Sequence, residues 1–399
     1  MKIAFALFKY FDFGGLQLDT MRFIRELLAR GWYVTLFAGE IDSELPELPG
    51  FTVHKIELKS RSNHARAVEF ERKFHTLTDG RFDVTTAMNR ITGCDFYFAA
   101  DDCILDHFLQ KHSRLTVSLL PRYRTFTRIE REIFAPGGST EILYLAERQK
   151  IAFRQRYGTE ESRFHLLPPG IPDKYRTVRA NWTRAKRQCI RREFGIGEND
   201  FLVLFIGSNF LLKGLDRAIR ILAALPENEQ KTTRLLAVGP GRQNQVLPLI
   251  RRHRLDDHVL FAGPRSDTED LLPASDLLVL FSYSEATGTV IAESLCCGVP
   301  VLCAENCGFS TLAKEAGSEA VPSPWSDETA LTLFRKIRND SEEYRRKANE
   351  YADRTDFFRR SACMADILED FARKKHGDSP ETRRTGEPVT ASDKAQHGK

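Results

Sequence analysis

The chain has 399 residues, of which 42% are hydrophobic, so it can bury the cores of two or three domains. Its formal net charge of +4 is too small to indicate a nucleic-acid partner. No apolar run reaches the ~18 residues of a membrane span, and the N-terminal residues show no signal-peptide pattern. We therefore expect a protein that stays in the cytoplasm.

The first half begins with the alternation of strand and helix that builds parallel sheets. Residues 3–8 form a continuous apolar run typical of a buried parallel strand. A Gly-Gly pair follows at 14–15, and apolar residues then recur at helical spacing over 16–28. Residues 34–38 are the next strand candidate. Less regular strand candidates lie at 51–58, 83–85 and 95–99.

The second half repeats this alternation more clearly, with helical segments between most of its strand candidates. These candidates lie at 201–206, 235–238, 259–261, 277–281 and 299–303. Strands that alternate with helices form parallel, doubly wound sheets. The sequence therefore predicts an α/β fold of two Rossmann-like doubly wound domains, which face a cleft where the carboxyl ends of the strands bind ligands.

Prolines mark the boundary between the two halves. The segment Pro168-Pro-Gly-Ile-Pro172 is incompatible with a regular helix or a central strand. The expected parts are a first domain at 1–170, a second domain at 171–356, a helix at 357–375 that can cross back to the first domain, and a tail at 376–399. The tail contains almost no large apolar side chains, which predicts disorder.

Two of the strand-to-helix junctions can bind an anion. At Gly14 and Gly15 the first N–H groups and the positive dipole end of the following helix are open to a ligand, although such a pair can also be a simple turn. At the junction after the strand at 277–281, the first amides of the next helix can cradle a phosphate. These amides belong to Gly288, Thr289 and Val290.

Two glutamates and a lysine accompany these junctions. Glu285 falls in the loop after the strand, and Glu293 falls about two turns into the helix. Carboxylates repel an anion but accept hydrogen bonds from hydroxyls. A sugar on one side of the phosphate site and a ribose on the other would therefore explain both glutamates. A solvent-facing acid and a helix-face acid remain the alternative. Lys213, at a third junction, is placed to neutralise a diphosphate leaving group, unless it is an ordinary surface lysine.

Glu285 and Glu293 form an E-x7-E pattern, and Leu295-Cys-Cys-Gly-Val-Pro-Val-Leu follows it. This region resembles the retaining transferases of glycosyltransferase family 4, which have the GT-B fold. Further segments are similar to those of the lipopolysaccharide core glucosyltransferase I proteins of Gram-negative bacteria, and the resemblance extends from Lys2 to about Ala372. These segments are Lys9-Tyr-Phe-Asp-Phe-Gly-Gly-Leu-Gln17, Ser62-Asn-His64, Tyr97-Phe-Ala-Ala-Asp101 and Leu167-Pro-Pro-Gly-Ile171.

The resemblance implies a retaining hexosyltransferase that moves glucose from UDP-glucose onto a heptose of the lipopolysaccharide inner core, with no cofactor. The first domain would bind the acceptor and the second the nucleotide sugar. Glu285 would hold hydroxyls of the donor sugar, Glu293 the ribose and Lys213 the diphosphate. Asp19 and Asp101 would line the acceptor side, and with Glu285 and Lys213 they form the implied catalytic set. The implied donor-binding residues are Gly14, Gly15, Leu16, Lys213, Arg265, Glu285, Gly288, Thr289, Val290 and Glu293.

One position departs from the family pattern. Many relatives carry an arginine that pairs with the lysine of the diphosphate clamp, and here Ser208 occupies that place. The clamp would then depend on Lys213, backbone amides and Arg265. No Asp-x-Asp lies at a strand end to hold a divalent cation, because the pairs at 101–102 and 256–257 lack that setting, so we expect transfer without a metal ion.

The acceptor side suggests a membrane surface. The segment 122–131 interleaves four arginines with aromatic and aliphatic residues. Basic residues attract a protein to anionic lipid and aromatic residues favour the interface, although an ordinary solvated helix has the same composition. A lipid-linked acceptor favours a peripheral protein on the inner face of the inner membrane. The residues expected on this side are Arg122, Tyr123, Arg124, Phe126 and Arg128.

Two other functions are compatible with the same scaffold. One is an inactive GT-B protein that binds a nucleotide sugar or a glycan, although the intact Glu285, Glu293 and Lys213 argue against it. The other is a nucleotide-sugar epimerase, which would convert the donor without any acceptor. Turnover of the donor by the purified protein separates these alternatives.

Overall fold

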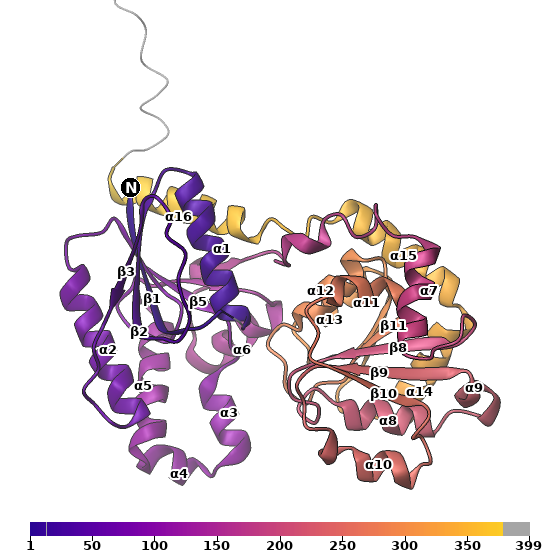
Figure 1. Cartoon of the computed structure of the whole chain (residues 1–399). Helices are drawn as coiled ribbons and strands as arrows, with labels where there is room; N and C mark the ends of the chain where they lie inside the picture. The colour runs from indigo at the N-terminus through magenta and orange to yellow at the C-terminus, as the bar shows by residue number, and fades with distance from the viewer. Residues whose placement is uncertain (13, 378–399) are drawn as a thin grey trace, which may run out of the picture.

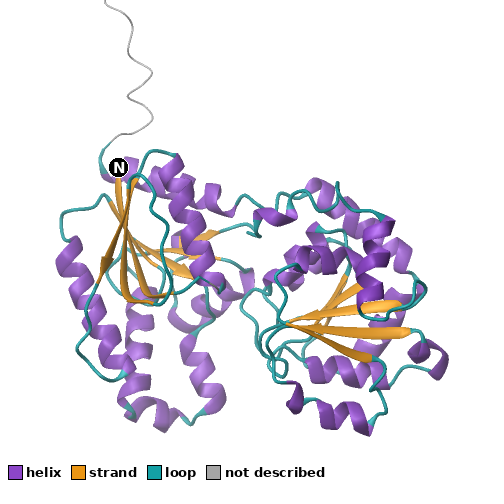
Figure 2. Ribbon diagram, viewed as in Figure 1, coloured by secondary structure: helices purple, strands orange, loops and turns teal. Residues whose placement is uncertain are grey.

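The computed structural model describes residues 1–12 and 14–377 and shows two α/β domains beside each other (Figure 1). Each domain has one parallel sheet with helices on both faces (Figure 2). The strand order is β3-β2-β1-β4-β5-β6-β7 in the seven-stranded sheet and β10-β9-β8-β11-β12-β13 in the six-stranded sheet. The chain order reverses at β1 and at β8, as in doubly wound sheets, so the predicted fold class is confirmed.

The first domain is built around β1, whose interior from Ile3 to Leu7 is apolar and fully buried between two layers of helices. Its elements in chain order are β1 (Lys2–Tyr10), α1 (Gly15–Ala29), β2 (Tyr33–Ile41), β3 (Phe51–Lys55), α2 (Asn63–Thr78), β4 (Val84–Ala87), β5 (Phe96–Ala99), α3 (Ile104–Lys111), α4 (Arg114–Leu119), α5 (Pro121–Phe134), β6 (Glu141–Tyr144), α6 (Glu147–Tyr157), η1 (Glu161–Arg163) and β7 (Phe164–Leu166).

The second domain has β8 at its centre, again apolar and buried along most of its length. Its elements are η2 (Asp173–Tyr175), α7 (Arg184–Glu193), β8 (Phe201–Ile206), α8 (Leu215–Ala223), α9 (Glu227–Lys231), β9 (Thr233–Val238), η3 (Gln243–Gln245), α10 (Leu247–Arg252), β10 (Val259–Gly263), α11 (Thr268–Ala274), β11 (Leu277–Leu280), α12 (Thr289–Cys296), β12 (Val301–Ala304), α13 (Ser310–Glu315), β13 (Glu319–Val321), α14 (Asp327–Asn339) and α15 (Ser341–Arg354).

The last helix, α16 (Arg360–Lys375), returns to the first domain and packs against α1 (Figure 1). Met364 and Leu368 on α16 belong to the same buried cluster as apolar residues of α1 and β1. In the preceding connection, Leu167 packs in the first-domain core and Ile171 in the second-domain core. The chain therefore passes between the domains twice. Residues 378–399, which make up most of the predicted tail, lie outside the described residues.

The cysteines pack in the cores rather than cross-linking the chain. All eight are free, and only Cys189 is exposed. Burial raises the pKa of the Cys307 thiol to about 12, so it stays protonated at neutral pH.

Candidate active site

The loops that follow β8 and β11 meet at one side of the second sheet because the two strands are adjacent and parallel. Lys213 lies in the turn after β8, and Gly214 caps the next helix with a φ of 79°. A Cβ atom on Gly214 would collide with the carbonyl of Phe281, so only glycine allows the turn to approach the end of β11 this closely. This approach brings Lys213 to the loop that carries Glu285.

Lys213 and Glu285 form an ion pair at this junction. The Lys213 ammonium donates directly to Glu285 Oε2, and the Ser282 hydroxyl donates to the same oxygen at 3.4 Å. The two side chains are only 22% and 12% exposed, so water screens the pair weakly. The predicted diphosphate-binding lysine and the predicted sugar-binding glutamate therefore lie in contact in the ligand-free protein.

Glu293 has different surroundings from Glu285. It lies on α12, and its Oε2 accepts a hydrogen bond from the Tyr175 hydroxyl at 3.1 Å. The Tyr175 hydroxyl also lies 2.8 Å from the Thr268 hydroxyl, so residues from η2 and α11 position this carboxylate. Burial raises the pKa of Glu293 above its ordinary value, and the phenol opposes that shift. Tyr175 could not be predicted as a partner of Glu293, because the two residues lie 118 positions apart in the chain.

The start of α12 fits the predicted anion cradle. Gly288 is the N-cap with a φ of 79°, and a Cβ there would lie 3.0 Å from Leu280. Thr289 and Val290 are the first two residues of the helix, where N–H groups have no intrahelical acceptor. The loop before α12 is held by a backbone hydrogen bond from another loop, in which Gly308 donates its N–H to the carbonyl of Glu285.

In the first domain, α1 begins beside open space. Gly14 is the N-cap with a φ of 104°, a conformation that favours glycine. A Cβ on Gly15 would have no heavy atom within 4 Å, so a ligand can reach the backbone here. Leu16 follows in the first turn and is half-buried.

The structure places the two predicted acceptor-side aspartates differently. Asp19 on α1 is 7% exposed and accepts hydrogen bonds from Arg360 at 2.7 Å and from Arg22 at 3.0 Å. It therefore lies in an ion-pair network between α1 and α16. Asp101, after β5, has a side chain that is 76% exposed, with Arg90 at 3.8 Å. Of the two, Asp101 is the one accessible to an acceptor.

Arg265, after β10, is already neutralised by two carboxylates. Its guanidinium lies 2.6 Å from Asp267 and 2.5 Å from Glu193, and both raise its pKa. A diphosphate would have to compete with these partners for Arg265. Other cations therefore remain candidates to replace the diphosphate-binding arginine that the resemblance implies.

Arg148 lies at the boundary between the two domains and was not predicted from the sequence. It lies on α6 of the first domain, and its Nη2 donates to Asp102 Oδ2 at 2.5 Å and to the Glu285 carbonyl at 2.6 Å. Its Nε is buried without a hydrogen-bond partner among the described residues. Burial raises the pKa of Asp102, and Arg148 opposes this effect. One guanidinium thus links the acceptor-side loop to the donor-side loop across the domain boundary.

Glu130 on α5 fixes the acceptor-side loop from behind. It is fully buried and accepts hydrogen bonds from the Ile104 N–H at 2.8 Å, the Tyr157 hydroxyl at 2.6 Å and Arg90 Nε at 3.0 Å. Arg90 also donates to the carbonyl of Asp102 at 2.7 Å. The start of α3 and the cleft loop before it therefore depend on this one carboxylate.

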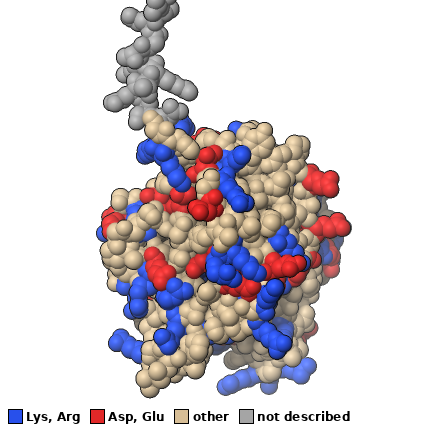
Figure 3. Space-filling model, turned by 90° about the vertical axis from the view of Figure 1, so that its left-hand side faces the viewer, with Lys and Arg blue, Asp and Glu red and all other residues tan. Residues whose placement is uncertain are grey.

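The predicted membrane-side residues lie on or beside an exposed corner formed by α4 and α5. Arg122, Arg124 and Arg128 are exposed, whereas Tyr123 packs edge-on against Phe108 with ring centroids 4.7 Å apart. Phe126 is half-buried. Three large aliphatic side chains are exposed beside these arginines: Leu115, Leu119 and Leu120. Basic side chains gather at the lower end of the face in Figure 3, where Figure 1 places α4 and α5. None of the described helices is long and apolar enough to cross a bilayer.

Comparisons with known proteins identify the family of the chain, and the region that matches includes Lys213 and Glu285. Residues 186–355 match the family model described as "Glycosyl transferases group 1". The chain is 34% identical over 375 residues to the lipopolysaccharide glucosyltransferase WaaG of Escherichia coli (strain K12). The aligned region covers 92% of this chain and 98% of that relative. It is 25% identical over 340 residues to a D-inositol 3-phosphate glycosyltransferase of Xylanimonas cellulosilytica, with 75% of this chain and 78% of that relative covered.

Solved structures agree with this assignment. A crystal structure of WaaG, described as a glycosyltransferase involved in lipopolysaccharide biosynthesis, superposes with a TM-score of 0.80 at 33% identity, covering 92% of this chain and 99% of that one. Anabaena Alr3699/HepE in complex with UDP and glucose superposes with a TM-score of 0.68 at 18% identity, covering 93% of this chain and 100% of that one. The second likeness concerns the fold alone.

Proposed function

This chain belongs to the group 1 glycosyltransferases, family 4 of the GT-B fold, and from this premise we propose that it is a retaining, metal-independent hexosyltransferase. Its donor is UDP-glucose and its acceptor is a heptose of the lipopolysaccharide inner core. The relative with 34% identity is a lipopolysaccharide glucosyltransferase, and a structure of the same fold holds UDP and glucose, which supports this choice of substrates.

The observation that carries the proposal is the ion pair between Lys213 and Glu285 beside the start of α12. A diphosphate at this junction attracts Lys213, and Glu285 is then released to accept hydrogen bonds from the donor sugar. The lysine and the amides of Thr289 and Val290 stabilise the negative charge that grows on the leaving group. This preorganised positive charge takes the place of a divalent cation.

The anomeric configuration is retained because the acceptor oxygen attacks the anomeric carbon on the same face from which the diphosphate leaves. The bond between the anomeric carbon and the phosphate oxygen breaks, the acceptor oxygen bonds to that carbon, and the acceptor proton moves to the departing phosphate oxygen. A covalent route needs a free carboxylate nucleophile. Asp102 is bound to Arg148, and Glu285, once released from Lys213, accepts hydrogen bonds from the donor sugar, so neither carboxylate is left free for that role.

Glu293 supplies the second recognition element. Its carboxylate is held by Tyr175, which in turn contacts Thr268. A fixed, partly dehydrated carboxylate is suited to the two vicinal hydroxyls of a ribose. UDP-glucose therefore binds across the carboxyl ends of the second sheet, with its glucose toward Arg148 and Asp101.

The acceptor approaches from a membrane surface. The exposed arginines of α5 and the neighbouring leucines combine positive charge with apolar side chains, a combination that binds anionic lipid. We place the protein in the cytoplasm, peripherally attached to the inner face of the inner membrane, with no nucleic-acid partner.

The direct test is a donor screen with a purified lipid-core acceptor, followed by mass spectrometry, with and without excess chelator. The expected result is the addition of one hexose from UDP-glucose at an unchanged rate in chelator. Activity lost in chelator and restored by magnesium or manganese would overturn metal independence. Donor conversion without an acceptor would indicate an epimerase, and donor binding without turnover would indicate an inactive scaffold.

A further inference from the structure

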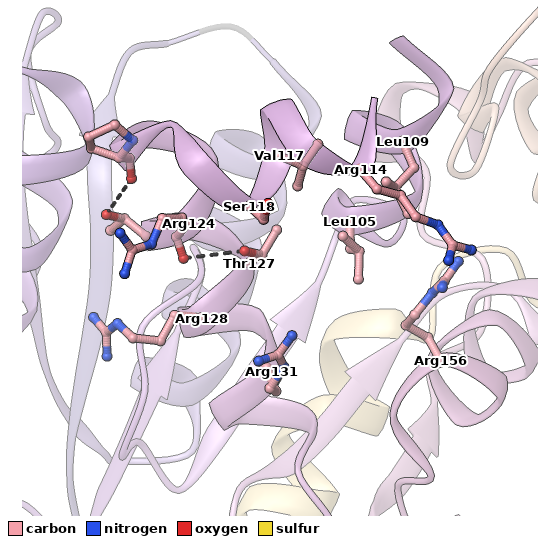
Figure 4. A pocket seen from close by; sticks show the side chains of 12 residues that line it. Leu105, Leu109, Arg114, Val117, Ser118, Arg124, Thr127, Arg128, Arg131 and Arg156 are labelled. Carbon is pink, nitrogen blue, oxygen red and sulfur yellow. Dashed lines mark hydrogen bonds between the residues drawn. The ribbon is translucent and has the colours of Figure 1, made fainter. Parts of the chain in front are cut away.

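A groove of about 770 Å³ lies in the first domain, and all the residues that line it belong to that domain (Figure 4). It is enclosed by α3, α4, α5 and the end of α6, and Leu105, Leu109 and Val117 form its apolar side. Its polar side carries five arginines, which are Arg114, Arg124, Arg128, Arg131 and Arg156. A volume of this size suits a bound small molecule or a sugar chain.

The arginines of the groove are incompletely neutralised. Arg156 pairs with Asp106 and Arg128 with Glu132. Arg114, Arg124 and Arg131 form no ion pair within the described residues. Figure 4 shows the guanidinium groups of Arg114 and Arg156 turned toward each other although they come from different helices. Asp106 already neutralises Arg156, so of these two groups Arg114 is the one whose charge has no partner among the described residues.

The groove adjoins the acceptor side of the cleft. Helix α3 begins at Ile104, directly after the exposed Asp101 and its neighbour Asp102, and Leu105 lies within its first turn. The helix has eight residues, so it spans about 12 Å from the cleft loop to its far end. On the other wall, Arg131 directly follows Glu130, which holds the start of α3. A chain of a few sugars can therefore reach from the groove to the cleft.

We propose that this arginine groove binds phosphate groups of the lipid-linked acceptor while the acceptor's reactive sugar lies in the cleft. This inference rests on the proposed transfer to a lipid-linked sugar. Guanidinium groups form bidentate, charge-assisted hydrogen bonds with phosphate, and the apolar side of the groove accommodates the C–H faces of sugars. The acceptor is thus held at two points, by its reactive sugar and by its phosphates.

A bilayer phospholipid is a poorer occupant of the groove. Leu115, Leu119 and Arg122 are exposed outside the groove and remain available to lipids of a flat membrane, whereas the exposed Arg124 and Arg128 belong to both surfaces. The groove arginines instead converge from several helices on one hollow, which suits a discrete anionic group that enters it.

The test compares binding of two acceptors by calorimetry in detergent: the phosphorylated lipid-core acceptor and the same acceptor after phosphatase treatment. The variant is Arg114→Gln combined with Arg131→Gln, because neither arginine has an ion pair to lose. The matched control is Arg72→Gln, at an exposed arginine on α2 outside both the groove and the membrane-side corner. The double variant should bind the phosphorylated acceptor at least about tenfold more weakly and the dephosphorylated acceptor as the wild type does. The control should bind both normally.

Other outcomes overturn the proposal. Equal losses for both acceptors would show that the groove does not recognise phosphate, and so would no loss for either. A double variant that loses binding to phosphatidylglycerol vesicles but keeps acceptor binding would assign the groove to the bilayer. An Arg114→Lys and Arg131→Lys variant retains the charge and should recover part of the affinity. Because the readout is binding, its failure is distinct from failure of the transferase function, which the wild-type turnover assay reports.

Discussion

Lys213 and Glu285 are 72 residues apart in the chain, yet their side chains form a direct ion pair where β8 and β11 end side by side. The pair keeps each charge neutralised while no donor is bound. In the proposed function a diphosphate competes for the lysine, so donor binding would at the same time release Glu285. Each glutamate of the E-x7-E pattern therefore has its own partner and its own expected kinetic effect.

Replacing Glu285 with glutamine should mainly lower kcat, because the sugar it contacts changes its charge distribution as the bond to phosphate breaks. Loss of one hydrogen bond to a charged group costs about 1.5–3 kcal/mol, which corresponds to about tenfold to a hundredfold in rate. Steady-state kinetics with both substrates measure it. Glu319→Gln, which breaks a comparable pair with Lys336, should leave kcat unchanged. If Glu285→Gln turned over normally, Glu285 would have no part in the chemistry.

Replacing Glu293 with glutamine should mainly raise the donor KM, by about tenfold, because the ribose does not change during the reaction. Burial raises the pKa of Glu293, so on acidification this carboxyl takes up its proton earlier than an ordinary glutamate does. UDP affinity should accordingly weaken as the pH falls through that raised pKa. The Glu293→Gln variant should lack this pH dependence.

Tyr175→Phe provides the control for this pH dependence. The variant removes the hydrogen bond that favours ionised Glu293, so UDP affinity should begin to weaken at a higher pH than in the wild type. Calorimetric titrations with UDP across the acid range measure the shift. Identical pH profiles for the wild type and Glu293→Gln would contradict the assignment of the ribose to Glu293.

Replacing Arg148 with glutamine should impair the acceptor side more than donor binding. The variant removes the charged link between Asp102 and the Glu285 carbonyl, so the acceptor KM should rise and kcat should fall by about tenfold. UDP affinity should change little. Arg154→Gln is the matched control, since Arg154 lies on the same helix and pairs with the surface residue Glu161. A selective loss of UDP affinity would instead assign Arg148 to the diphosphate.

Replacing Glu130 with alanine should destabilise the first domain by about 3–5 kcal/mol, because it leaves the buried Arg90 charge with only the exposed Asp101, 3.8 Å away, as a partner. Glu130 is fully buried and the Arg90 side chain is 12% exposed. Denaturant unfolding followed by tryptophan fluorescence measures the effect. The double variant Arg90→Met with Glu130→Leu should recover much of the stability. Its acceptor KM should nevertheless stay high, because the loop before α3 has lost its anchor.

Replacing Leu115 and Leu119 with serine together with Arg122→Glu should weaken binding to anionic vesicles. Each lost charge near the surface is worth about 1 kcal/mol, and the buried apolar area adds to that. Raised salt should weaken the wild type through screening. Leu166→Ser, at another exposed leucine, should bind as the wild type does. Vesicle binding that survives the triple substitution would show that this corner is only a solvated surface.

Local patterns were sufficient for much of the fold. Long apolar runs predicted β1 and β8, and the glycines at the following junctions indicated where the helices begin. The strands β6, β7 and β13 were not predicted. β7 and β13 have only three residues each, too few to show a period, and β6 adds only three apolar residues after a glutamate. Their pairing is decided by the neighbouring strands in the sheet.

The sequence by itself also determined that Glu285 lies in a loop and Glu293 on the helix that follows, because their spacing is set by that one loop and one helix. Only the tertiary structure decided their partners. Tyr175 reaches Glu293 across 118 residues, Arg148 reaches the Glu285 carbonyl across 137, and Arg360 reaches Asp19 across 341. Such pairs form when domains dock and chain ends return, and neither event leaves a periodic trace in the sequence, since periodicity records only which face of an element is buried.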